Sequence, residues 1–378
     1  MEAYLDNSAT TPVCPEAVEA VNHVLVDCWG NPSSLHFGGM EAAEVLENSR
    51  HSIAKKLSCD DSEIYFTSGG TEANNLAVFG AAHAYRSRGM RIITSSVEHP
   101  SIEEPIKQLE MQGYEVVRLR TDEYGRFDER QLYAAVNMMT SLISIMAVNN
   151  EVGTIENIEK ARIAVKKFNA PALIHCDAVQ AFGKIPLKPS AMGIDLMSIS
   201  SHKIHGPKGA GALYVKKGSK VAHHIFGGGQ EHGMRPGTEP LPAIAGFAAA
   251  ADALPDINMS LAKVTELRDY FVSCLKEFDD VVINSPSDAL PYITNFSVIG
   301  IPSEVMLNYL SEMNIYVSGG SACSKGHRSR VLTSMNLDSQ RINSAVRVSL
   351  SRYTSKQEID YLLEGISSAR KSIMKRLK

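Results

Sequence analysis

Cysteine is scarce in this chain and widely scattered. Six cysteines are spread over 378 residues, at positions 14, 28, 59, 176, 274 and 323, and no Cys-x-x-Cys pair occurs. A disulfide framework would need cysteines at closer and more regular spacing in a chain of this length. The pattern therefore predicts reduced thiols and a cytoplasmic protein.

An excess of charge and a long apolar run are also missing. Lysine and arginine number 38 against 42 acidic residues, a formal net charge of −4, so no basic surplus favours direct nucleic-acid binding. The longest run of small apolar residues, Ala243–Ala251, is too short to span a bilayer. The start, Met1–Asp6, lacks the pattern of a signal peptide. We expect neither a membrane nor a nucleic acid among the partners.

Several common site motifs are absent as well. No Walker A sequence occurs, and Gly206–Gly211 has the wrong order for a dinucleotide-binding fingerprint and precedes a strand. The histidine pairs at 202 and 205 and at 223 and 224 lack a cysteine or carboxylate at a known ligand spacing. We therefore predict no metal site.

What the sequence does contain, between residues 60 and 215, is an alternation of short apolar runs and helical stretches. This alternation predicts a mostly parallel sheet covered on both faces. The predicted helices include Glu72–Arg88 and Asp128–Met139. The predicted strands are Glu63–Thr67, Arg91–Ser95, Glu115–Leu119, Leu142–Val148, Ala172–Cys176, Asp195–Ile199 and Gly211–Val215.

The pattern changes after about residue 255. It predicts a long helix over Ser260–Phe278, a strand near Ile293–Val298, two shorter helices and a final helix after Ser355. These elements indicate a second, smaller α+β domain. With 44% hydrophobic residues, the chain is long enough to bury two cores.

Lys203 and Asp177 each follow an apolar strand pattern. Ligands of open α/β sheets bind beyond the carboxyl ends of the strands, so these two side chains can converge. Pyridoxal phosphate needs such a pair, because the lysine forms a Schiff base and the acid pairs with the pyridine nitrogen. A plain ion pair at a strand edge is the alternative.

Two further segments end near the same sheet edge. Residues 66–75 follow a strand and open a helix, with Gly70 and Thr71 at its start, where free N–H groups attract phosphate. A simple capped helix start is the alternative for this segment. His99 follows another strand and precedes Pro100, so its imidazole can reach a cofactor ring. A polar loop histidine is the alternative there.

Cys323 stands apart from the other cysteines. It lies in a glycine- and serine-rich loop and is followed by Lys325, His327, Arg328 and Arg330. Nearby cations favour the thiolate, the nucleophilic form of cysteine. A buried, inert thiol is the alternative, but the polar flanks count against it.

Arg347 alternates with Val346 and Val348 on a strand pattern, Ala345–Leu350. Its guanidinium would therefore face the side opposite to the valines. A bidentate grip on a substrate carboxylate is one interpretation, and a structural ion pair is the other.

Taken together, the motifs resemble those of pyridoxal-phosphate-dependent cysteine desulfurases of the NifS/IscS type, in the class-V aminotransferase family. The resemblance covers almost the whole chain, and the motifs follow in the family's order. They are Tyr4–Pro12, Asn31–Ser34, Ser68–Leu76, Val148–Gly153, His175–Gln180, Ser200–Lys203, Arg235–Thr238 and Ser321–Cys323.

The resemblance implies an aspartate-aminotransferase-like fold (pyridoxal phosphate fold type I) and a homodimer with active sites at the subunit interface. Residues 13–254 would form the large cofactor-binding α/β domain. Residues 1–12 and 255–378 would form the small α+β domain carrying the Cys323 loop. Small departures from the family's pattern occur at Gly70, Ser201 and Pro236.

The resemblance also implies a role for each matching residue. Catalysis would fall to Lys203, Cys323 and His99, and substrate binding to Arg347 and Asn150. Pyridoxal phosphate would be bound by Gly70, Thr71, His99, Asn150, Asp177, Gln180, Ser200, His202, Lys203 and, from the partner subunit, Thr238.

The implied reaction converts L-cysteine to L-alanine and moves the sulfur to Cys323 as a persulfide. The sulfur would then pass to an acceptor protein for iron–sulfur cluster assembly or for tRNA or cofactor thiolation. Two alternatives remain open: another enzyme of the same fold, such as an aminotransferase or a selenocysteine lyase, and a cofactor-free sulfur-relay protein.

Overall fold

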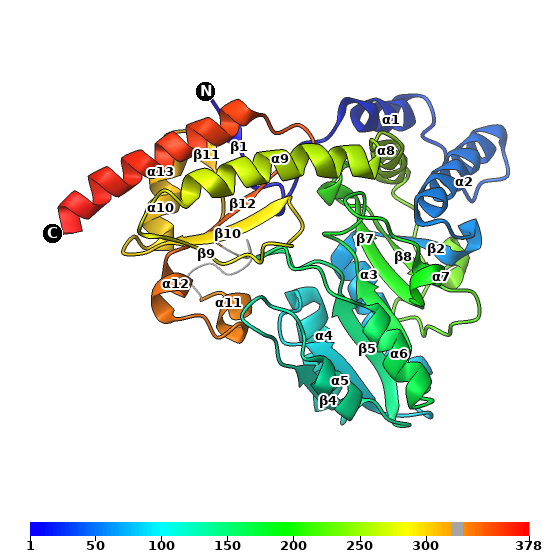
Figure 1. The fold of residues 1–378 in the computed structure, drawn as a ribbon. Coiled ribbons are helices and arrows are strands. Elements are labelled where there is room, and N and C mark those ends of the chain that lie inside the picture. Colours follow the sequence, from blue (N-terminus) through cyan, green and yellow to red (C-terminus); the bar gives the residue numbers. More distant parts are fainter. Residues whose placement is uncertain (320–327, 378) are drawn as a thin grey trace.

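The computed structural model describes residues 1–319 and 328–377, and within them a seven-stranded sheet forms the centre of the larger region (Figure 1). Its strand order is β2-β8-β7-β6-β5-β3-β4. Only β8 runs antiparallel to its neighbours, because the pairs from β7 to β4 are all parallel. The strands are β2 (Ile64–Thr67), β3 (Arg91–Ser95), β4 (Glu115–Leu119), β5 (Thr140–Met146), β6 (Leu173–Asp177), β7 (Leu196–Ser200) and β8 (Gly211–Val215).

Both faces of this sheet are buried. Neighbouring residues of one strand, such as Leu142 and Ile143, enter separate apolar clusters because successive side chains point to opposite faces. Helices α3 and α4 cover the face to which Leu142 belongs. The helical elements of this region are α1 (Pro15–Val26), α2 (Phe37–Leu57), η1 (Asp61–Glu63), α3 (Gly70–Ala84), α4 (Pro100–Met111), α5 (Glu129–Ala135), α6 (Glu159–Lys167), α7 (Pro189–Met192), η2 (Ser201–Lys203), η3 (Gln230–Gly233) and α8 (Leu241–Asp252).

The predicted strands of this sheet are confirmed to within two residues at each end, but two predicted helices are too long. Helix α3 ends at Ala84 and α5 at Ala135. A close backbone contact explains why both helices end early. A Cβ built on Gly89 would lie 2.1 Å from the carbonyl oxygen of Met139. The chain must leave both helices before these residues, so that β3 and β5 can start side by side.

The smaller region contains an antiparallel sheet of order β12-β10-β9, with helices α9 and α13 in contact with each other beside it (Figure 1). The N-terminal strand β1 pairs in parallel with β11. The elements are β1 (Ala3–Tyr4), α9 (Ile257–Leu275), β9 (Val281–Ile283), β10 (Ile293–Val298), α10 (Ser303–Glu312), β11 (Ile315–Tyr316), α11 (Arg330–Ser334), α12 (Ser339–Asn343), β12 (Ala345–Ser349) and α13 (Lys356–Leu377).

Two predictions for this region need correction. Three short helices, not two, lie between β10 and α13 in the described residues. The apolar side chains also do not divide into one core per region: Leu5, Ile199 and Phe296 belong to one continuous cluster. The two sheets fall within the predicted ranges 13–254 and 255–378, but the division into domains at those residues stays a prediction. No helix in the described part of the chain is long and apolar enough to cross a membrane.

Candidate active site

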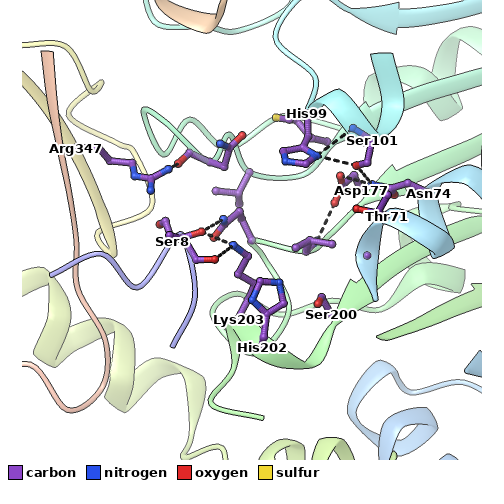
Figure 2. A pocket seen from close by; sticks show the side chains of 17 residues that line it. Ser8, Thr71, Asn74, His99, Ser101, Asp177, Ser200, His202, Lys203 and Arg347 are labelled. Carbon is purple, nitrogen blue, oxygen red and sulfur yellow. Dashed lines mark hydrogen bonds between the residues drawn. The ribbon is translucent and has the colours of Figure 1, made fainter. Parts of the chain in front are cut away.

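A cavity of about 260 Å³ lies beyond the carboxyl ends of β5, β6 and β7, where the smaller region meets the large sheet (Figure 2). Arg347 enters it from β12, and Ser8 enters it from the N-terminal segment. The structure brings ten of the twelve predicted site residues to its wall: Gly70, Thr71, His99, Asn150, Asp177, Gln180, Ser200, His202, Lys203 and Arg347.

Asp177, the last residue of β6, presents a firmly held carboxylate to the cavity. Its side chain is only 6% exposed. Asn74 of helix α3 donates from Nδ2 to Asp177 Oδ2 at 2.8 Å, and the backbone N–H of Val179 donates to Oδ1 at 3.0 Å. A carboxylate fixed in this way can hold a cationic N–H group inside the cavity.

The amine of Lys203 lies in the cavity at the end of η2. Its Nζ donates to the backbone carbonyl of Ala9 at 2.7 Å and also to that of Ser8. The N–H of Ser8 in turn donates to Ser349 Oγ at 2.8 Å, which ties this segment to β12. The N-terminal segment therefore positions the lysine from the side opposite to the large sheet.

His99 caps the N-terminus of helix α4, and this contact fixes its tautomer. Its Nδ1 accepts the backbone N–H of Ser101 at 3.2 Å and lies 2.8 Å from Ser101 Oγ. Burial lowers the pKa of His99; Asp177 opposes this shift, while Lys203 and Arg330 add to it. The imidazole is therefore neutral near pH 7 and carries its proton on Nε2.

The part of the cavity at the start of helix α3 is suited to an anion. Helix α3 starts at Gly70 with no side-chain cap at Gly69, so Thr71 does not cap it. A Cβ on Gly70 would lie 2.7 Å from Val179 Cγ2, so a larger residue here would require the valine side chain to move. The hydroxyl of Ser200 is buried and has no hydrogen-bond partner among the described residues. The N–H groups of the first helical turn and this hydroxyl can together bind a phosphate.

His202 adds a neutral donor to the same end. Burial, with a further contribution from Lys203, lowers its pKa to about 4. Its Nδ1 lies 3.3 Å from Thr10 Oγ1. A neutral imidazole here offers a hydrogen bond to an anion without adding a second fixed charge.

Of the two interpretations that its sequence pattern left open, Arg347 shows the structural ion pair. It is 1% exposed and forms an ion pair with Asp6, with Nη2 2.7 Å from Oδ1. Its Nη1 donates to the carbonyl of Asn150 at 2.9 Å. Its Nε is buried and has no partner among the described residues. The guanidinium is thus held by the protein at the wall of the cavity.

Of the remaining two predicted site residues, the structure describes only Thr238. Thr238 is exposed and does not line the cavity. Cys323 lies outside the described residues. The flanks of its segment are described: Ser318 pairs with the backbone of Arg347, and Arg330 donates to the carbonyl of Glu98 and pairs with Glu103 at 3.2 Å.

Sequence reasoning missed the residues that hold the site residues in place. Asn74 orients Asp177, Ser101 orients His99, and Ser8 receives Lys203. A signal existed for Asn74, because it lies three residues after Thr71 on the same face of a predicted helix. No local pattern could connect Ser8 to Lys203, since 195 positions separate them.

Comparison with known proteins identifies the family. The model of the class-V aminotransferase family matches residues 3–362.

The chain belongs to the class-V aminotransferase family.

Curated relatives of this chain include the cysteine desulfurase IscS of Dictyoglomus turgidum, which is 42% identical over 368 residues, 96% of this chain and 93% of that protein. The cysteine desulfurase of Homo sapiens is 38% identical over 96% of this chain and 80% of that protein. A solved NifS-like protein superposes with a TM-score of 0.92 at 37% identity, covering 97% of this chain and 99% of the other. SspA in complex with cysteine superposes with a TM-score of 0.83 at 33% identity, over 93% and 100% of the two chains.

Members of this family are pyridoxal-phosphate-dependent enzymes, and the cavity fits that cofactor. The unpartnered Ser200 hydroxyl and the start of α3 suit a phosphate. Asp177 suits a protonated ring nitrogen, and Lys203 offers an amine of the kind that such a cofactor requires. The resemblance predicted from the sequence motifs is confirmed, and so is the fold class.

Proposed function

We propose that this enzyme is a cysteine desulfurase, which takes the sulfur from L-cysteine, leaves L-alanine and carries the sulfur on Cys323 as a persulfide. The relatives named above as cysteine desulfurases and the cysteine-bound SspA support this substrate. The observation that carries the proposal is the anchoring of the Cys323 segment. One flank, Ser318, is hydrogen-bonded to Arg347 and the other, Arg330, to the residue before His99, so the two flanks contact opposite sides of one cavity.

Pyridoxal phosphate, when bound, supplies an electron sink that makes the α-proton of an amino acid removable. The phosphate would be held by Gly70, Thr71, Ser200 and His202, with Thr238 from a second copy of the chain. Asp177 would hold the proton of the ring nitrogen, Gln180 Nε2 would donate to the ring oxygen, and His99 would lie against the ring.

The substrate would be bound through its carboxylate. Arg347 would pair with it from the cavity wall, and Asn150 lies beside Arg347 because its carbonyl accepts a hydrogen bond from Arg347 Nη1. A guanidinium pairs with a carboxylate in a fixed orientation, which sets the α-carbon near Lys203. Lys203 Nζ then takes the α-proton, and His99 Nε2 is placed to exchange a second proton.

The sulfur step falls to Cys323. Its thiolate Sγ attacks the substrate sulfur, so that an S–S bond forms as the Cβ–S bond of cysteine breaks. The electron pair of the broken bond stays with the carbon skeleton, which leaves as alanine after protonation. The cations that follow Cys323 in the sequence favour the thiolate. The persulfide then passes its outer sulfur to an acceptor for iron–sulfur cluster assembly or for thiolation, in the cytoplasm.

We also propose a homodimer. Residues 25–40 expose several large apolar side chains in a short stretch, including Trp29 at 79% and Leu35 at 97%. Soluble monomers rarely expose so many neighbouring apolar groups. Thr238 is exposed and does not line the cavity of its own chain, as expected of a residue that contributes to the partner subunit's site.

The function is tested by replacing the thiol. Cys323→Ser should keep its cofactor absorption and still bind cysteine, but it should release little alanine, because a hydroxyl is a far weaker nucleophile toward sulfur. Cys59→Ser is the control and should react like the wild type. If Cys323→Ser makes alanine at the wild-type rate, the desulfurase mechanism is wrong. Transfer of the amino group to a keto acid would then identify an aminotransferase.

The dimer is tested by mixing two impaired chains. Co-expressed Lys203→Ala and Thr238→Ala chains should regain activity, because one site of the mixed dimer then has both native residues. The control pair, Lys203→Ala with Thr71→Ala, should regain none, since both residues come from the same chain's site. Equal results from the two mixtures would contradict the placement of Thr238 in the partner's site.

A further inference from the structure

Behind the wall of the active-site cavity lies a second lysine, Lys184, which none of the steps above uses. It is 8% exposed, and its ammonium lies 5.7 Å from the centre of the Tyr292 ring. It borders a small cavity of about 20 Å³ that also touches Lys203 and Ser260. A space of that size holds about one water molecule.

Among the residues that the structure describes, no acid pairs with this buried cation. The charged groups that act on Lys184 are Lys203 and Arg347, which are both cationic. Burial first, and then these two charges, lower the pKa of Lys184 to about 7. The nearby imidazoles of His202 and His205 are neutral at that pH, because burial lowers the pKa of each to about 4. A buried lysine without an acid destabilises a fold, so an apolar side chain would suit stability better at this position.

The hydrogen bonds of Lys184 lead to the active site. Its Nζ donates to Gln180 Oε1 at 3.3 Å, and Gln180 Nε2 donates to the carbonyl of Ser8 at 2.9 Å. The same carbonyl accepts the amine of Lys203. Below its pKa of about 7, Lys184 is an ammonium, which can only donate, so it requires the carboxamide oxygen of Gln180 to face it and the NH₂ group to face Ser8 and the cavity.

We propose that Lys184 is a positioning residue: it fixes the orientation of the Gln180 carboxamide and, through the shared Ser8 carbonyl, the place and charge environment of the Lys203 amine. The proposal rests on the roles given above to Gln180 and Lys203. A donor on Oε1 polarises the amide, so Gln180 Nε2 becomes a stronger donor toward the cavity. A second cation near Lys203 disfavours its protonated form, and a proton-abstracting amine must be unprotonated.

The test replaces Lys184 by methionine, which has similar length but no charge. In the holoenzyme, the pH at which the visible absorption of the cofactor changes should rise by about one unit, because the repelling cation is gone. In the cofactor-free full-length chain, amine labelling of the Lys203 peptide at pH 6, where Lys184 still carries its charge, should fall several-fold for the same reason. Neither readout needs turnover of cysteine, so a failed desulfurase assay would leave this test intact.

Two further variants separate positioning from structure. Lys184→Arg keeps a cationic donor and should keep both readouts near the wild type. Lys188→Met makes the same exchange at an exposed lysine of the same segment and should change neither. Lys184→Met should melt at or above the wild-type temperature, since it removes a buried unpaired charge. If Lys184→Met titrates and labels like the wild type, the proposal is wrong. It is also wrong if Lys184→Met melts at a lower temperature than the wild type and Lys184→Arg shows the same spectral and labelling changes.

Discussion

On the large-sheet side of the cavity, the functional side chains stand at the ends of β6 and β7 and at the starts of helices, whereas the opposite side is assembled from β12 and the N-terminal segment. On the first side, the sheet register places Asp177 and Ser200 directly. On the second side, Arg347 and Ser8 owe their places to contacts between segments more than 300 residues apart.

The two sides also differ in their charged groups. The large-sheet side presents a fixed acid, neutral imidazoles and a free helix start, which suit a cofactor that stays in place. The opposite side presents the Arg347 guanidinium and one flank of the Cys323 segment, whereas the other flank contacts Glu98 on the large-sheet side. We infer that variants of the first side impair the cofactor and the chemical step, whereas variants of the second impair cysteine binding or sulfur transfer.

The largest effect is expected at Lys203. Lys203→Ala should lower kcat on the order of 10³–10⁴-fold, because no other group at that place can take the α-proton. The visible absorption band that the holoenzyme owes to the cofactor bound at Lys203 should disappear as well. Lys217→Ala, at an exposed lysine of the same region, is the control. Normal turnover in Lys203→Ala would show that the large-sheet side does not perform the chemistry.

The next effect is expected at Asp177. Asp177→Asn should slow exchange of the α-proton of cysteine with solvent by about 10²–10³-fold, because the carboxylate that retains the proton of the cofactor ring is lost. Exchange can be followed by NMR in deuterated water. Asp195→Asn is the matched control: this acid lies before β7, at the other edge of the same sheet. An unchanged exchange rate would make Asp177 a structural residue.

A different kind of effect is expected on the opposite side. Arg347→Lys should raise the KM for cysteine about tenfold and leave the cofactor spectrum unchanged, because an ammonium replaces a guanidinium that binds in a fixed orientation. Arg341→Lys, an arginine of the same region outside the cavity, should leave KM unchanged. A lowered kcat at unchanged KM would contradict the assignment of cysteine binding to this side of the cavity.

The smallest effect on activity is expected at Glu98, which lies beneath His99. Burial raises the pKa of Glu98 from 4.5 to about 8. Between these values the folded chain holds a proton that the unfolded chain releases, so stability falls as the pH rises from about 4.5 to 8. Glu98→Gln should remove this loss and melt a few degrees higher than the wild type at pH 8.5, but not at pH 4.5. Glu104→Gln, at an exposed glutamate, is the control, and a parallel pH profile in both variants would contradict the assignment.

The sequence predicted the large-sheet side better than the other. Asp177, Lys203 and His99 each follow a strand, and the carboxyl ends of parallel strands meet at one edge, so their convergence follows from the order of strands and helices alone. The strands β1, β9 and β11 were not predicted, because two or three residues are too few to show a period of two.

The opposite side depends on contacts that no local pattern encodes. Arg347 was identified on its strand, but its partner Asp6 lies 341 positions away. Lys184 was overlooked although it lies four residues after Gln180, because a lysine beside a strand end is usually a solvated side chain. Only its burial in the folded chain distinguishes it.

The central claim is that sulfur passes from cysteine to Cys323, and mass spectrometry of the wild-type holoenzyme tests it most directly. After brief exposure to L-cysteine and blocking of free thiols, the peptide carrying Cys323 should bear one added sulfur atom. The peptides that carry the buried Cys176 and the partly buried Cys59 should not, since burial raises the pKa of both thiols and keeps them protonated. Added sulfur on those peptides, or alanine formation without any sulfur on Cys323, would contradict the account.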